Sequence, residues 1–285
     1  RQNPPAQFAD AQSGFWNGGG LRCGICVNGG ERMAVMGSRA KVLVTLSYDG
    51  TRYHGFQVQQ NALSVCEVLQ NALEQLYGTR PPVKGCSRTA AGVHATGYCV
   101  SYEQPKPIDP FKLPLALTRF LPPDVRAHHA RWVDDEFHAR YSAISKEYRY
   151  RVRASAVDSP FDSAYCWRIA RKLDVEAMHR AAQYVVGTHD FCAFMSTGSK
   201  VEDTVRTVFF FRVKQEGEII TFHISADGYL YNMVRILVGT LIDVGAGRKR
   251  PEEMKQVLEG KDRSKAGDTA PAKGLFLHCV HYPEE

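Results

Sequence analysis

The chain has 285 residues, enough for one large domain or two ordinary domains around a buried core. Hydrophobic residues make up 44% and charged residues 23%, a balance that excludes wholesale disorder. The net charge of +6 suits a polyanionic partner without requiring one, and the most apolar stretch, residues 233–244, is too short and too charged to span a membrane.

Residues 1–40 show no sustained hydrophobic period, so we expect a disordered leader there. No secretory signal is visible in it. Eight cysteines are scattered along the chain without a dense framework, which favours reduced thiols and a cytoplasmic protein. Cys23 and Cys26 form a lone C-x-x-C pair, and a zinc site would need two further ligands. A metal-binding protein is therefore the weakest alternative, and we expect no metal.

The folded part begins with an alternating pattern over residues 41–46, which predicts a strand that ends at the turn Asp49-Gly50. Ser64 and Glu67 have the spacing of a capping box, and the apolar stripe that follows predicts a helix over residues 65–76. Two short strands, a second helix and a further strand follow, at residues 83–87, 97–102, 109–120 and 125–133.

The second half of the chain has the same order of elements. Residues 147–153 predict a strand with tyrosines and a valine on one face and three arginines on the other. A helix begins at Asp174 and runs to Val186, where Gly187 ends it. The remaining strands are expected at residues 205–213, 219–226 and 275–280, and the remaining helices at residues 231–244 and 251–260.

Two successive β-α-β-β-α-β patterns predict an α+β protein built from two ferredoxin-like halves with mainly antiparallel sheets. We place the halves at residues 41–140 and 141–285, and the cleft between them is the default ligand site. The chain contains no phosphate-binding loop, no zinc-protease motif and no nucleophile elbow. Nothing therefore supports a nucleotide cofactor or a catalytic metal, and any catalysis would depend on side chains alone.

The most unusual local segment is the signature loop, residues 86–95, which is small, polar and contains Gly92. Loops between rigid strands often carry function, although a plain connector is commoner. The glycine is expected to supply a backbone conformation that other residues resist.

The signature loop resembles the motif R-T-D-A-G-V-H-A of the tRNA pseudouridine synthase A family and differs from it at one position. Other segments are similar to the same family in the same order: Tyr48-Asp49-Gly50, Gly55-Phe56-Gln57, Phe137-His138-Ala139-Arg140, Tyr148-Arg149-Tyr150, Asn232-Met233-Val234-Arg235, Val238-Gly239, Lys261-Asp262-Arg263 and Gly274-Leu275. The resemblance covers residues 41–283 and implies two ferredoxin-like halves. It also implies cofactor-free isomerisation of uridine to pseudouridine at positions 38–40 of the tRNA anticodon stem-loop, carried out by a homodimer.

The position that differs is Ala90, where the family has its catalytic aspartate. Pseudouridine formation breaks the bond between uracil N1 and the ribose, turns the base and rejoins it through C5. A carboxylate serves this reaction as nucleophile or base, and a methyl group can do neither. Another carboxylate, such as Asp49 or Asp227, would have to reach reactive geometry to replace it.

The resemblance therefore implies a chain that binds tRNA and does not isomerise it. An engineered replacement of aspartate by alanine is the interpretation we favour over a naturally inactive paralogue. The alternative function is a non-catalytic RNA-binding or tRNA-folding module.

Three further residues belong to the expected catalytic site. Arg235 lies in an apolar helix, where it must meet an anion or reach solvent at the helix edge, and the resemblance pairs it with the catalytic aspartate. The resemblance also makes Tyr148 the residue that stacks on the target base. It makes Arg88 the residue that displaces or holds the flipped nucleotide. A core tyrosine and a solvated arginine are the alternatives for these two.

The expected RNA-binding residues are Arg88 and four others: Thr89, His94, Arg149 and Arg151. Arginines at alternate positions of a strand are candidates for tracking an RNA backbone, although each taken singly is more often solvated. His94 lies in the signature loop, where the residues alone favour a structural role in bonding backbone groups.

Overall fold

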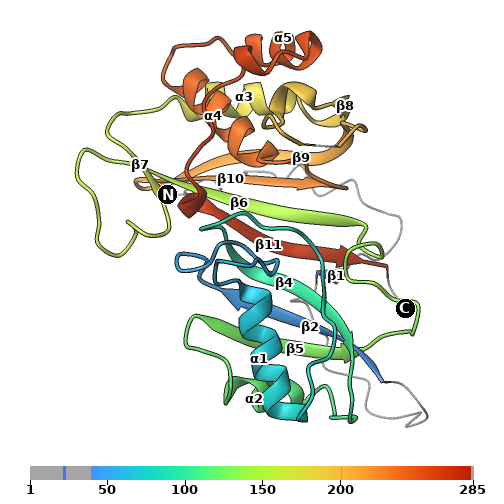
Figure 1. Cartoon of the computed structure of the whole chain (residues 1–285). Helices are drawn as coiled ribbons and strands as arrows, with labels where there is room; N and C mark the ends of the chain where they lie inside the picture. The colour runs from blue at the N-terminus through green and yellow to red at the C-terminus, as the bar shows by residue number, and fades with distance from the viewer. Residues whose placement is uncertain (1–21, 24–39, 200, 284–285) are drawn as a thin grey trace, which may run out of the picture.

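The computed structural model describes residues 22–23, 40–199 and 201–283. Its strands are β1 (Arg22–Cys23), β2 (Lys41–Tyr48), β3 (Lys84–Gly85), β4 (His94–Glu103), β5 (Val125–Trp132), β6 (Ser145–Ala154), β7 (Trp167–Ile169), β8 (Gly187–Asp190), β9 (Val205–Glu216), β10 (Ile219–Ala226) and β11 (Leu275–Tyr282). Its α-helices are α1 (Val65–Tyr77), α2 (Leu113–Thr118), α3 (Val175–Gln183), α4 (Met233–Gly245) and α5 (Glu253–Gly260). The principal strands form one sheet in the order β5-β2-β4-β11-β6-β10-β9-β8 (Figure 1).

The strand order repeats along the sheet. In the first part β2 lies between β5 and β4, and the short β3 pairs with β4. In the second part β6 lies between β11 and β10, and β9 follows β10. All of these neighbours are antiparallel, whereas β4 and β11 join the two parts through a short parallel pairing. The prediction of an α+β fold with mainly antiparallel strands is confirmed, although the strands form one continuous sheet.

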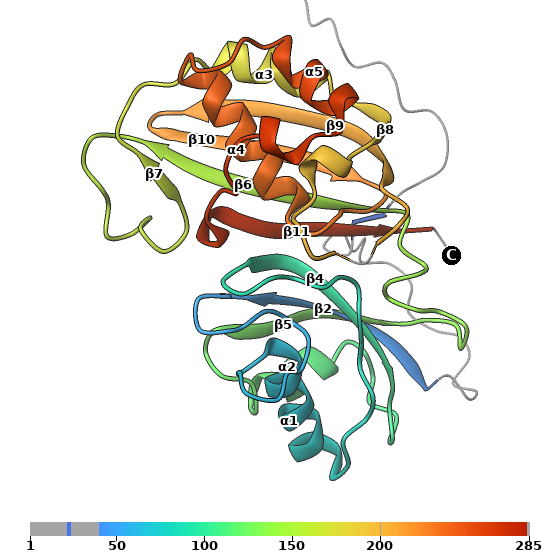
Figure 2. The same cartoon turned by 45° about the horizontal axis from the view of Figure 1, so that its top comes forward.

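The helices cover the two parts of the sheet separately. Figure 2 shows α1 and α2 against the strands of the first part and α3, α4 and α5 against those of the second, on the same side of the sheet. The side chains of β6 alternate accordingly, with Tyr148, Tyr150 and Val152 buried. Helix α4, which is buried along most of its length, packs near this face. The first residues of α4 therefore lie on the same side of the sheet as Tyr148.

The ends of the helices follow from their capping residues. Ser64 Oγ accepts a hydrogen bond from the backbone N–H of Glu67 at 3.2 Å, so α1 begins as predicted. Asp174 Oδ1 accepts from the N–H of Ala177 at 2.8 Å and begins α3. Helix α3 ends before its predicted boundary, and Gly187, with φ of 108°, instead begins β8. Helix α2 is also shorter than predicted, because Asp109 forms a turn ahead of it by accepting from the N–H of Phe111.

The remaining expectations concern the leader, the cysteines, a membrane-spanning helix and the boundary between the two halves. The expected leader lies outside the described residues except for residue 40 and for β1, which pairs with β11. Cys26 also lies outside them. Five described cysteines are free thiols, but Cys279 is in a disulfide, so the expectation of reduced thiols is wrong at that position. No helix in the described part of the chain has both the length and the apolar character needed to cross a membrane. The division of the chain near residue 140 stays a prediction.

Candidate active site

The first part of the signature loop is held to the sheet by side-chain hydrogen bonds. The Tyr48 hydroxyl lies 2.9 Å from Thr89 Oγ1, and the Ser87 hydroxyl lies 3.3 Å from the hydroxyl of Tyr148. The N–H of Val93 donates to the carbonyl of Ala90 at 3.2 Å and closes a tight turn in which Gly92 has φ of 73°. The predicted conformation of this glycine is confirmed, and the turn fixes where the side chain of Ala90 points.

Two glycines let a neighbouring segment approach this loop. A Cβ atom on Gly50 would lie 2.1 Å from the carbonyl oxygen of Val93. A Cβ atom on Gly55, whose φ is 90°, would lie 2.3 Å from the carbonyl oxygen of Thr89. The segment at residues 48–57 is thus a support for the signature loop, and only glycine permits the close contact.

A cavity of about 770 Å³ opens beside the loop, between the two parts of the sheet. This volume is in the range of small-molecule and nucleotide sites. Its wall combines the signature loop, the start of β6, the segment before α4 and the first turn of α4. The structure brings together five of the expected site residues in this wall: Arg88, Thr89, Ala90, Tyr148 and Arg235.

The charges that line the cavity are all of one sign. Five cationic side chains line it, namely Arg88, Arg140, Lys146, Arg206 and Arg235. No aspartate or glutamate of the described chain lines it. An anionic ligand such as a nucleic acid therefore suits the cavity on electrostatic grounds.

Arg235 is half-buried in the first turn of α4. Its Nε donates to the carbonyl oxygen of Ala270 at 2.6 Å, and its Nη1 donates to Asn232 Oδ1 at 3.0 Å. Burial lowers the pKa of the guanidinium, and within the described residues no carboxylate pairs with it. Asn232 has a left-handed backbone with φ of 60°, a conformation that asparagine tolerates better than most residues. The hydrogen bond that Arg235 donates to Asn232 therefore helps to orient the guanidinium toward the cavity.

Tyr148 is 6% exposed and forms part of the cavity wall. Its ring meets that of Tyr229 edge to face, with centroids 4.9 Å apart. Burial raises the pKa of the Tyr148 hydroxyl, which therefore stays protonated near neutral pH. The contact with Tyr229 holds the ring of Tyr148 in the cavity wall.

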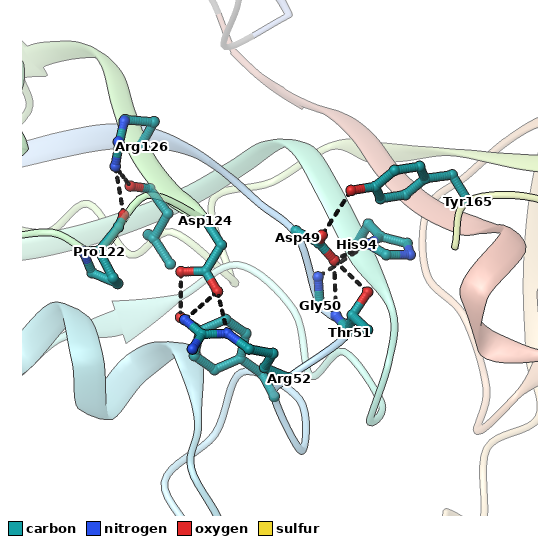
Figure 3. Close-up of polar contacts among 11 residues, drawn as sticks. Asp49, Gly50, Thr51, Arg52, His94, Pro122, Asp124, Arg126 and Tyr165 are labelled. Atoms are coloured by element: carbon teal, nitrogen blue, oxygen red, sulfur yellow. Dashed lines mark hydrogen bonds and ion pairs between the residues drawn. The ribbon is translucent and has the colours of Figure 1, made fainter. Parts of the chain in front are cut away.

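His94 lies away from the cavity and is 1% exposed. Its Nδ1 accepts from the N–H of Gly50 at 3.0 Å and lies 3.1 Å from Asp49 Oδ1. The other oxygen of Asp49 accepts from the hydroxyl of Tyr165 (Figure 3). Its other ring nitrogen lies 3.2 Å from the carbonyl oxygen of Lys273. Burial lowers the pKa of His94, so it stays neutral. The histidine joins residues from both halves of the chain, which agrees with the structural role favoured by the residues alone.

Arg149 and Arg151 project from the opposite face of β6 to Tyr148. Neither lines the cavity, and Arg151 lies 3.6 Å from Asp162 in a weak ion pair. The alternation of side chains along a strand already separates them from Tyr148. A role for both in RNA binding stays a prediction, and it would require RNA on this second face.

Sequence reasoning did not single out Lys146 or Arg140 as site residues. Lys146 is two residues before Tyr148 on the same strand, so the period of two could have identified it. Arg140 belongs to a segment that resembles the family, but no local pattern indicates its contribution to the cavity. Across the described ranges, no group of three or more histidine, cysteine, aspartate or glutamate side chains is arranged to hold a metal ion.

Comparison with known proteins bears directly on this site. The family model described as tRNA pseudouridine synthase matches residues 45–142 and 181–283, which together hold the signature loop, Arg140 and α4. The chain is 44% identical to tRNA pseudouridine synthase A of Thermoanaerobacter sp. (strain X514) over 241 residues, 85% of this chain and 99% of that protein. It is 41% identical to tRNA pseudouridine synthase A of Bacillus subtilis (strain 168) over 240 residues, 84% of this chain and 97% of that protein.

Among solved structures, the chain is similar to one in the crystal structure of a Cbf5-Nop10-Gar1 complex. The TM-score is 0.34 at 12% identity, over 73% of this chain and 46% of that one. The expected family is confirmed by the family model and by the relatives over nearly all of the folded part. The chain belongs to the tRNA pseudouridine synthases, a family of isomerases.

Proposed function

We propose that this chain binds tRNA and holds a uridine in the cavity, but does not convert it to pseudouridine. The observation that supports this proposal is the composition of the cavity wall, where five cations and Ala90 stand without a carboxylate from any residue that the structure describes. The family reaction needs a carboxylate beside the ribose and the base. A pocket with this wall is suited to binding a uridine. Among the described residues, it lacks the carboxylate that would react with that uridine.

The two carboxylates considered as replacements are engaged elsewhere. Asp49 accepts from Tyr165 at 2.8 Å and from Thr51. Asp227 accepts from the N–H of Thr207 at 3.0 Å, and neither aspartate lines the cavity. Since a small displacement from reactive geometry costs much of the rate, neither is expected to replace the missing group.

The target that we propose is a uridine at positions 38–40 of the anticodon stem-loop. The resemblance supports these positions, and the relatives named tRNA pseudouridine synthase A support tRNA as the substrate. A homodimer that contacts one RNA with both subunits, and a cytoplasmic location, are parts of the same proposal. A target uridine must leave the base stack to reach the cavity, where Tyr148 offers a surface for stacking and Arg88 a cation at the rim.

The test of tRNA binding is the salt dependence of the dissociation constant for an unmodified tRNA. If four or five cations of the cavity wall each neutralise an RNA phosphate, affinity should fall about 100- to 500-fold between 50 and 200 mM salt. Filter binding or anisotropy at four salt concentrations measures this slope. An affinity that does not change over this range would contradict a site for the RNA backbone.

A second candidate function is a non-catalytic RNA-binding or tRNA-folding module. None of the described residues that line the cavity is a carboxylate, and this favours the non-catalytic module as well. The two functions differ in one outcome, because only a disabled enzyme can regain activity when a carboxylate is placed at position 90.

A further inference from the structure

Lys146 is a cation of the cavity wall that has no partner of its own. It lies on β6 two residues before Tyr148, so both side chains project from the same face of the strand, and both line the cavity. The residue is largely buried. Its ammonium makes no hydrogen bond or ion pair with any residue in the described part of the chain.

The other four cations of the wall are in different situations. Arg235 donates to the carbonyl of Ala270, and Arg206 donates to the carbonyl of Val205. Arg88 and Arg140 are exposed and keep their hydration. Among the cavity-lining cations that the structure describes, Lys146 alone is both largely buried and unpartnered. Holding an ammonium out of water without an anion costs free energy, so a ligand must offset that cost.

The protein itself supplies no such anion. Burial is the main cause that lowers the pKa of Lys146, and the nearby Arg140 lowers it further. The Cys86 thiol acts in the opposite direction, but burial raises its own pKa, so it stays a neutral thiol near neutral pH. Asp227 acts in the opposite direction, but its carboxylate accepts from Thr207 and forms no ion pair with Lys146. The oxygen that accepts a hydrogen bond from this ammonium must therefore enter the cavity with the substrate.

We propose that Lys146 binds an oxygen of the target nucleotide at the floor of the cavity, an inference that rests on the proposed function. A uracil carbonyl and a flanking phosphate both offer such an oxygen. The exposed Arg88 and Arg140 suit phosphates, which stay partly hydrated at the rim. The buried position beside Tyr148 suits a uracil carbonyl, since the base enters furthest once it stacks on that ring.

The test uses an anticodon stem-loop RNA with uridine at the target position and the same RNA with an abasic ribose there. Dissociation constants are measured for the chain and for Lys146→Met, Lys146→Arg and Lys214→Met. Lys214 is an exposed lysine of β9 outside the cavity, so its variant is the matched control. Lys146→Met should weaken binding of the uridine RNA about tenfold and leave the abasic RNA nearly unaffected. Lys146→Arg should stay close to the parent chain.

Thermal unfolding separates a binding role from a structural one. Removal of an unpaired buried charge should raise the Tm of Lys146→Met by about 2 °C or more, while the same variant binds RNA less well. A Tm below that of the parent chain would mean that Lys146 is structural and would overturn the inference.

The remaining outcomes are also distinct. If the parent chain binds neither RNA, the proposed function fails and this inference fails with it. If the parent chain binds and Lys146→Met binds equally well, only the role of Lys146 is overturned. An equal loss on both RNAs would support the site and assign its oxygen to a phosphate.

Discussion

Glu147 is a half-buried carboxylate that two histidines keep ionised. Its Oε2 lies 2.7 Å from His223 Nε2, and its Oε1 lies 2.8 Å from His281 Nε2. Burial alone would raise the pKa of Glu147, but the hydrogen bonds from the two histidines outweigh burial and lower it. These contacts tie together β6, β10 and β11 on the face of the sheet opposite to Tyr148.

Replacing Glu147 with glutamine should destabilise the protein by about 1.5–3 kcal/mol at neutral pH, because hydrogen bonds to a charged acceptor are lost. The pKa of Glu147 is lower in the folded than in the unfolded protein. Its stabilisation is therefore complete above the unfolded pKa of 4.5 and declines as the pH falls below that value. Urea unfolding at pH 7 and at about pH 4 measures both differences. A gap between Glu147→Gln and the parent chain that stays constant with pH would contradict this account.

At the scale of elements, the position of the signature loop depends on the segment at residues 48–57, which packs against the loop. Helices α1 and α3, one in each half of the chain, begin where their caps predict, at Ser64 and Asp174. Strands β7 and β8 were not predicted, because three or four residues are too few to show a period. The close approach of Gly55 to Thr89 was also beyond prediction, since it joins segments that are far apart in the sequence.

Gly55→Ala should cost more than about 3 kcal/mol of unfolding free energy. The substitution combines a left-handed backbone with a methyl group 2.3 Å from the carbonyl oxygen of Thr89. Gly78→Ala is the matched control, because Gly78 has φ of 74° and open space around it. The control should cost only about 1–2 kcal/mol, from the backbone alone. Equal losses in the two variants, measured by urea unfolding, would mean that the contact with Thr89 does not restrain the loop.

Only part of the candidate site could be predicted from the sequence, because the rest depends on how strands far apart in the chain pair. Arg88, Ala90, Tyr148 and Arg235 come from segments with family motifs, and all four line the cavity. The positive charge of the wall depends also on Lys146 and Arg140, which become neighbours of the loop only when β4 and β11 pair. That pairing joins two registered residue pairs, Phe276 with His94 and Leu277 with Ala95, which no local sequence pattern indicates.

At the scale of the whole molecule, the pairing of β4 with β11 turns two similar halves into one binding site. One half provides the signature loop, and the other provides Lys146, Tyr148 and the start of α4. The contacts of Asp49 with Tyr165 and of His94 with the carbonyl of Lys273 reinforce the junction. The cavity proposed as the tRNA site is thus assembled around a position that carries a methyl group.

On the proposed function, one side chain separates this chain from an active enzyme. Mapping of pseudouridine in an unmodified tRNA, after treatment with the chain or with Ala90→Asp, tests it most directly. The substitution lowers the formal net charge from +6 to +5, because it adds one carboxylate to the 30 acidic residues. The new carboxylate would stand in a cavity that also holds Arg235. We predict pseudouridine only with Ala90→Asp. Activity in both proteins would mean that another carboxylate performs the reaction, and activity in neither would leave an RNA-binding protein without a dormant active site.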